Sequence, residues 1–268
     1  MIFVCRPPLF ISFPMNYLTS FDGLLWLLAA LVLLVFLQRS LHREIQAFFL
    51  ILSRRPGFTQ VIFALIFLPG VFLHELSHFL MAKLLGVQTG KFSLIPQAQP
   101  NGKLRLGYVE TVSGGFIRDA LIGVAPLVTG CLFVAFAAIY QLRLLPLWDF
   151  IRLAEWGGFW SGLMAVLKVP DFWLWFYLTF TIGSTMMPSA SDRNAWLPFG
   201  LLAGGLVGVA ILAGAGPWML ENLAPSFNSF LRALALIFGL SGVLHIILIL
   251  PFLLFHRILT RLTGVDIG

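Results

Sequence analysis

Long apolar runs separated by short polar segments set the pattern of this chain. Six runs are long enough for a membrane-spanning helix, near residues 22–38, 59–85, 113–140, 171–190, 194–215 and 229–255. A helix needs about 20 mostly apolar residues to cross the ~30 Å hydrocarbon core of a bilayer. The pattern therefore predicts an all-α polytopic membrane protein with about six transmembrane helices.

A short stretch between the second and third spans has the alternation of β-strands. The runs "KFSLIP" and "KLRLGYV" flank "QAQPNG", in which Pro100-Asn101-Gly102 is a turn signal. We expect a small membrane-associated β-hairpin at this position.

The segment from Leu142 to Pro170 mixes charged and aromatic side chains and differs from the continuous apolar spans. Its polar and tryptophan residues are Arg143, Trp148, Asp149, Arg152, Glu155, Trp156, Trp160 and Lys168. Tryptophan and basic residues gather at the level of the lipid headgroups, and amphipathic helices lie in that plane. We expect this segment to lie along the extracytoplasmic interface and not to cross the membrane.

Composition agrees with a membrane protein. Hydrophobic residues make up 59% of the 268 residues and charged residues 10%, and the mean hydropathy is +0.96. A soluble domain has about 25% charged residues. The net charge of +6 lies mostly in short loops, where the lipid bilayer explains it and nucleic acid is not needed. Cys5 and Cys131 predict neither a disulfide framework nor a cysteine metal site.

We interpret residues 1–268 as a single membrane-embedded domain, because no soluble domain, repeat or low-complexity tract interrupts the spans. An anchor helix near 22–38 precedes the central spans, and helices near 194–255 follow them. The glycine-rich run of the fifth span, with Gly204 and Gly208 four residues apart, favours close packing of helices.

Basic residues give the expected orientation. They follow the second span and end the chain, at Lys83, Lys91, Lys103, Arg105, Arg118, Arg257 and Arg261. Six spans place the hairpin and the C-terminus on the same side, which the positive-inside rule makes cytoplasmic. The arginines at 39, 43, 54 and 55 would then face outward, against the rule.

Candidate chemistry lies in the second span, in "FLHELSHF". On a helix, His74 and His78 project from one face, close enough for both imidazoles to bind one zinc ion, with Glu75 beside it to take a proton from a bound water. With five histidines and five glutamates in the chain, chance produces this pattern about 0.002 times. The alternative is a pair of packed histidines with Glu75 bonded to a neighbouring helix.

A catalytic zinc site usually has three protein ligands, so a third must be found. Asp192 follows the fourth span, where Pro188 breaks the helix and can turn the backbone inward. With only the third span crossing between them, the second and fourth spans run in the same direction, and Asp192 and His74 lie towards one face. The alternative is a loop aspartate paired with Arg193.

His245 is a further polar residue within an apolar span, the sixth. A core histidine bonded to a neighbouring helix is the favoured interpretation, and a gate or an additional ligand is the alternative.

These residues resemble the site-2 protease family of intramembrane zinc metalloproteases. The resemblance covers roughly residues 59–195: His74-Glu75-Leu76-Ser77-His78 in a span, a following hairpin, "GVAPLVTG" in the next span, and a proline followed by an aspartate after the fourth. It implies that His74, His78 and Asp192 bind zinc, that Glu75 is the general base, and that the hairpin receives the substrate strand. Ser184 stands nearest the place of the family's asparagine, and Ser191 and Arg193 flank the aspartate.

The resemblance implies a protease of the cell membrane that cuts membrane-protein substrates in or near their transmembrane segments, with its site towards the cytoplasm. A non-catalytic scaffold or chaperone with the same fold is the main alternative, although a scaffold has no need of Glu75. A transporter would show polar residues in several spans and repeated broken helices. Here the polar residues cluster in two spans.

Overall fold

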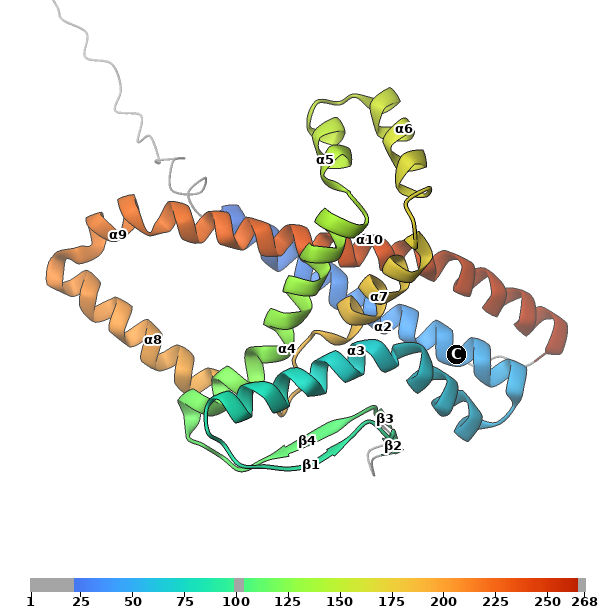
Figure 1. The fold of residues 1–268 in the computed structure, drawn as a ribbon, viewed down its shortest axis with the longest axis horizontal. Helices are drawn as coiled ribbons and strands as arrows, with labels where there is room; N and C mark the ends of the chain where they lie inside the picture. Colours follow the sequence, from blue (N-terminus) through green and yellow to red (C-terminus); the bar gives the residue numbers. More distant parts are fainter. Residues whose placement is uncertain (1–21, 99–103, 265–268) are drawn as a thin grey trace, which may run out of the picture.

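The computed structural model describes residues 22–98 and 104–264, and Figure 1 shows a bundle of helices with a small β-hairpin beside it. Among these residues, five helical segments are long and apolar enough to cross a membrane. They are α2 (Asp22–Ser53), α3 (Pro56–Leu84), α4 (Phe116–Phe136) continued by the π-helical turn η1 (Ala137–Gln141), α8 (Trp196–Ala210) continued through η2 (Ile211–Ala215) and α9 (Gly216–Asn222), and α10 (Ala224–Thr263). The predicted fold class, an all-α polytopic membrane protein with a β-hairpin, is confirmed.

The expected span at 171–190 is shorter than predicted. Its helix, α7 (Phe172–Thr185), has 14 residues, about 21 Å at the helical rise, which is less than the ~30 Å hydrocarbon core. Proline has no N–H and disfavours helical backbone in the residue before it, and α7 ends three residues before Pro188. Residues 186–195 are non-helical and lead to α8.

The segment at 142–170 forms two short helices, α5 (Leu145–Arg152) and α6 (Trp156–Val166), which pack against each other and project from the bundle (Figure 1). With 8 and 11 residues, neither helix is long enough to cross a membrane. The prediction that this segment does not cross as one full helix is confirmed. Its location at the extracytoplasmic interface stays a prediction.

The helices α3, α4 and α7 pack against one another. The hydroxyl of Tyr177 donates to the carbonyl of Ile66 at 2.8 Å, and Nδ1 of His74 lies 2.7 Å from the carbonyl oxygen of Thr185. Both pairs are separated by 111 residues, so α3 and α7 run in the same direction. This confirms the direction predicted for the second and fourth spans.

The outer pair, α2 and α10, also runs parallel. The side chain of Asn228 accepts from the N–H of Gly23 at one end, and His256 lies 2.6 Å from the Glu44 carboxylate towards the other. Both helices exceed the apolar runs that predicted them, with 32 and 40 residues, because the helical backbone continues through polar positions such as Arg43.

This parallel pairing corrects the expected topology. Since α2 and α3 are joined by the short turn at residues 54–55 and run antiparallel, the C-terminal end of α10 lies at the same end of the bundle as the N-terminal end of α3 (Figure 1). The hairpin follows the other end of α3. The prediction that the hairpin and the C-terminus share one side is wrong. The chain passes through α8 and α9 to the N-terminal end of α2, where α10 begins, and α10 then runs parallel to α2.

The β-hairpin lies along α3 (Figure 1) and is confirmed as predicted. Strand β1 (Thr89–Ser93) pairs antiparallel with β4 (Tyr108–Thr111), and β2 (Gln97–Ala98) pairs with β3 (Leu104–Arg105). The predicted turn at 100–102 falls outside the described residues. The register of β1 and β4 shifts between Thr89 and Phe92, which marks a bulge or irregularity.

We expect the hairpin and the end of α10 to be labelled from opposite sides of a membrane. In a chain whose two cysteines are replaced by serine, Lys91→Cys and Arg261→Cys should react with a membrane-impermeant maleimide on different sides of sealed vesicles. Detergent-solubilised protein, in which both cysteines should react, is the control. Labelling of both from one side would contradict the parallel arrangement of α2 and α10 across the membrane.

Candidate metal centre

The histidines predicted to bind metal lie one turn apart on α3. Their Nε2 atoms are 3.3 Å from each other, and the ring planes are inclined by 78°. Residues four apart lie on the same face of a helix, so local structure alone brings these two rings together.

A backbone carbonyl orients each ring. Nδ1 of His74 lies 2.7 Å from the carbonyl oxygen of Thr185 in α7, and Nδ1 of His78 lies 2.9 Å from that of Ile122 in α4. A carbonyl only accepts, so each Nδ1 carries the hydrogen, and the neutral ring presents a bare lone pair on Nε2. Metal-binding histidines are usually oriented by such an outer bond.

A proline inside α4 and the end of α7 make both carbonyls available. In α4, Pro126 has no N–H, so the helical bond that would otherwise engage the carbonyl of Ile122 four residues earlier is not made. In α7 the helix ends at Thr185, and the N–H of Ser189, four residues later, donates instead to the carboxylate of Asp192 at 2.7 Å. Two carbonyls without helical partners therefore point at the two imidazoles.

The predicted third ligand, Asp192, reaches the histidines. Its Oδ1 lies 3.3 Å from Nε2 of His78, and its Oδ2 lies 3.8 Å from Nε2 of His74. The loop comes this close because α4 has Gly123 opposite it: a Cβ there would overlap the carbonyl oxygen of Asp192. The non-helical segment after α7 thus closes the site from the side opposite α3.

The alternative pairing of Asp192 with Arg193 is not formed among the described residues. The guanidinium of Arg193 donates to the carbonyl of Ser189 at 3.3 Å, whereas the Asp192 carboxylate faces Nε2 of the two histidines. The N–H of Ser189 donates to Oδ2 of Asp192 at 2.7 Å, and a hydrogen bond of this kind favours the ionised carboxylate that a metal ligand must be.

These three side chains fit a metal ion. One ligand atom from each lies within 4.8 Å of the others, and two of the three edges are 3.3 Å. Ligands at 2.0–2.1 Å in a tetrahedron are ~3.3 Å apart, and two nitrogens with one carboxylate oxygen suit zinc. A cation between the three atoms relieves the repulsion among their lone pairs, as a proton on one imidazole also does. The side chains of the triad are 9–14% exposed, so the group can hold a metal ion and still meet water.

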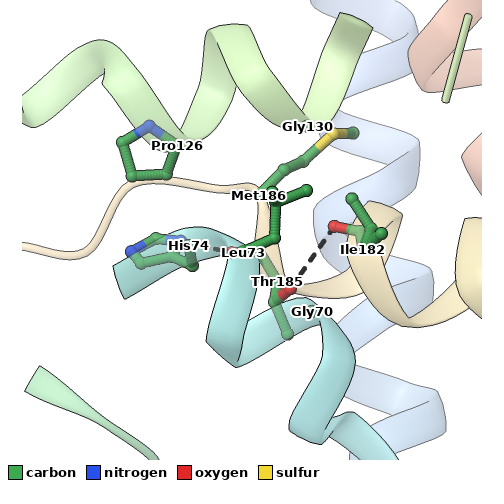
Figure 2. A pocket seen from close by; sticks show the side chains of 8 residues that line it. All are labelled: Gly70, Leu73, His74, Pro126, Gly130, Ile182, Thr185 and Met186. Atoms are coloured by element: carbon green, nitrogen blue, oxygen red, sulfur yellow. Dashed lines mark hydrogen bonds between the residues drawn. The ribbon is translucent and has the colours of Figure 1, made fainter. Parts of the chain in front are cut away.

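A narrow recess lies beside one ligand (Figure 2). Its walls come from α3, α4 and the end of α7, and are mostly apolar: Leu73, Pro126, Ile182 and Met186 surround it, with His74 at one side. Low polarity next to the ligand strengthens electrostatic interactions at the site.

The predicted general base, Glu75, follows His74 on α3 and is 9% exposed. The hairpin backbone passes over it: a Cβ at Gly107 would lie 3.0 Å from Cγ of Glu75 and 2.9 Å from Cγ1 of Val71. The structure therefore brings Glu75, the metal-binding group and the hairpin into one region.

Sequence reasoning missed three contributors: the carbonyls of Ile122 and Thr185, and Gly123 opposite the loop. A backbone acceptor has no signature of its own, but the interior proline of "GVAPLVTG" signals the first. Nothing in the sequence marks Gly123 apart from the other glycines.

Comparisons of the chain with protein-family models, with curated proteins and with solved structures find no match. The fold and the site define a polytopic membrane protein with a two-histidine, one-aspartate group that can hold a metal ion.

We expect Pro126→Ala to weaken metal binding. An alanine supplies the missing N–H, which competes with His78 for the carbonyl of Ile122, and outer-shell changes of this kind lower metal affinity about 10- to 100-fold. Competition of the purified protein with a zinc chelator measures the change. Pro251→Ala, in the interior of α10 and away from the triad, is the control and should leave affinity unaltered. Equal affinities in both variants would remove Pro126 from this role.

Proposed function

We propose that the chain is an intramembrane zinc metalloprotease, which hydrolyses peptide bonds in or near the transmembrane segments of other membrane proteins. The observation that carries the proposal is the convergence of His74, His78 and Asp192, with Glu75 next to them on an apolar helix. The resemblance to the site-2 protease family supports it. Packing in a helix bundle is enough to explain two neighbouring histidines. It does not explain why one ligand atom from each of His74, His78 and Asp192 lies within 4.8 Å of the others.

Zinc is the metal that the donor set favours, because imidazole nitrogens and one carboxylate suit it and tetrahedral geometry matches the 3.3 Å edges. His74, His78 and Asp192 would hold the zinc ion. A bound zinc ion would supply Lewis-acid chemistry, because it lowers the pKa of a water to about 7 and polarises a carbonyl.

Glu75 is the residue we assign to proton transfer. It accepts the proton of the attacking water and returns it to the departing amine, the usual task of a carboxylate beside a metal. Its place in the chain, directly after one histidine and three residues before the other, keeps it beside the metal-binding group. A scaffold would have no use for a carboxylate held within an apolar helix.

The hairpin is the element we assign to substrate capture. Peptide bonds in a helix are protected by their own hydrogen bonds, so a substrate must unwind before cleavage. Each described sheet has two strands, and an added strand could pair with a free edge. Gly107, directly before β4, approaches Glu75, which supports a role of the hairpin next to the proposed base.

The bilayer surrounds the protein, since five apolar helices are long enough to cross it. The plasma membrane as its location, and the cytoplasmic side for the metal centre, stay proposals. Arginines 54, 55, 257 and 261 gather at the end of the bundle away from the hairpin, and basic residues also flank the hairpin. The positive-inside rule therefore does not choose between the two orientations.

We expect Glu75→Gln to abolish proteolysis and keep zinc, because the amide has the same shape but accepts no proton. His74→Ala should lose both zinc and proteolysis. Zinc content of the purified proteins and cleavage of a panel of single-span membrane proteins are the measurements. Glu155→Gln, an exposed carboxylate between α5 and α6, is the matched control.

Cleavage by Glu75→Gln at the wild-type rate would exclude Glu75 as the base. Zinc binding by wild type without cleavage of any substrate would favour the non-catalytic scaffold. An absence of zinc from freshly purified wild type, also after incubation with zinc, would overturn the proposed metal.

Gly107→Ala is expected to slow cleavage and leave zinc bound. The added Cβ meets Val71 and Glu75 and pushes the hairpin away from α3, and a displacement of about 1 Å near a reacting group costs roughly 100-fold in rate. Cleavage rate and zinc content of the same preparation test this. Gly57→Ala, at the start of α3 with no atom within 4 Å of the new Cβ, is the control. A wild-type rate for Gly107→Ala would separate the hairpin from substrate presentation.

A further inference from the structure

The last turn of α7 is tethered by side chains from two other helices. The carbonyl oxygen of Ser184 accepts from the side-chain amide of Gln38 in α2 at 2.5 Å, and Oγ of Ser184 lies 2.7 Å from Nε2 of His245 in α10. The next carbonyl along the chain, that of Thr185, accepts the Nδ1 hydrogen of His74. The two tethers thus hold the residue next to the acceptor that orients a metal ligand.

The protonation state of the His245 ring follows from its second bond. Nδ1 lies 2.6 Å from the carbonyl oxygen of Ser241, which only accepts, so Nδ1 carries the hydrogen. In the neutral ring Nε2 is then the acceptor, and the hydroxyl of Ser184 is the donor. Ser184 is 1% exposed and His245 is 0% exposed, so no solvent replaces these bonds.

The tethers satisfy backbone that the helix cannot. The N–H that would engage the carbonyl of Ser184 belongs to residue 188, which is proline, and α7 has already ended. In hydrocarbon an unpaired carbonyl is unfavourable, and irregular backbone is tolerated only where protein groups satisfy it. Gln38 supplies the missing donor, and His245 fixes the side chain of the same residue.

We propose that His245 and Gln38 are positioning residues for the metal ligand His74, and that they act through Ser184 and the carbonyl of Thr185. The sequence predicted for His245 only a bond to a neighbouring helix, and that bond is present. The further step is that the partner of His245, Ser184, directly precedes Thr185, whose carbonyl accepts from His74. The inference rests on the metal site of the proposed function and not on proteolysis.

His42 offers a matched comparison. It is another histidine in an apolar helix, its ring packs edge-on against Phe63 and Phe67, and its Nε2 has no hydrogen-bond partner within residues 22–98 and 104–264. Replacement of either histidine by phenylalanine keeps the ring and removes polar nitrogens. Only the change at 245 breaks a tether to α7.

The experiment measures zinc affinity by chelator competition on full-length protein in detergent, together with the melting temperature and the absorption spectrum of the cobalt-substituted protein. We expect His245→Phe to bind zinc about 10- to 100-fold more weakly, as loss of outer-shell support does, with an altered cobalt spectrum. His42→Phe should keep wild-type affinity and spectrum. His245→Gln, whose amide oxygen can accept from Ser184, should recover most of the affinity.

A folded His245→Phe protein with wild-type affinity and cobalt spectrum would overturn the inference, and so would an equal loss in His42→Phe. If His245→Phe does not fold, Gln38→Leu and Ser184→Ala make the same test. Weaker zinc binding by both variants supports the inference. Wild-type affinity of Gln38→Leu would exclude Gln38 as a positioning residue, and wild-type affinity of Ser184→Ala would exclude His245. Wild type that binds zinc but cleaves nothing would remove the proposed protease and leave this inference intact. Wild type without zinc affinity would remove both.

Discussion

Two hydrogen bonds from imidazole to backbone, His74 to Thr185 and His78 to Ile122, are the interactions on which the candidate metal centre depends. Each bond leaves Nε2 as a bare acceptor and fixes the ring in one plane. Each also requires a carbonyl that its own helix does not use. In an apolar environment such carbonyls are unfavourable unless a donor is present. The Nδ1 hydrogens of His74 and His78 supply that donor, and the carbonyls in turn orient the two rings.

The direction of the helices follows from this requirement. The end of α7 reaches His74 only because α3 and α7 run parallel, and between them the chain returns once through α4. The short helices α5 and α6 make this possible, since together they reverse the chain without adding a crossing. A spanning helix there would have placed Asp192 at the far end of α3.

The helices α2 and α10 hold the last turn of α7 in place. The parallel pair α2 and α10 supplies Gln38 and His245 to the last turn of α7, which also contacts His74 of α3 and leads into the loop that carries Asp192. Nearby, the loop closes onto Gly123, and the hairpin closes onto Glu75 at Gly107. The region accordingly combines oriented side chains that can hold a metal ion with partial access to water.

The sequence by itself determined that this is a membrane protein, and it determined the first two of the three residues that can hold a metal ion. Apolar runs predict helices because the bilayer imposes their length, and His74 and His78 meet because helical periodicity is local. Asp192 was also predicted, since Pro188 marks the end of a helix and chain direction can be counted along short connections. Only the tertiary structure decided that the α7 helix is too short to span and that α10 runs parallel to α2. The carbonyls and tethers around His74 likewise depend on contacts between helices far apart in the chain, and side-chain periodicity contains no information about which backbone oxygen faces which ring.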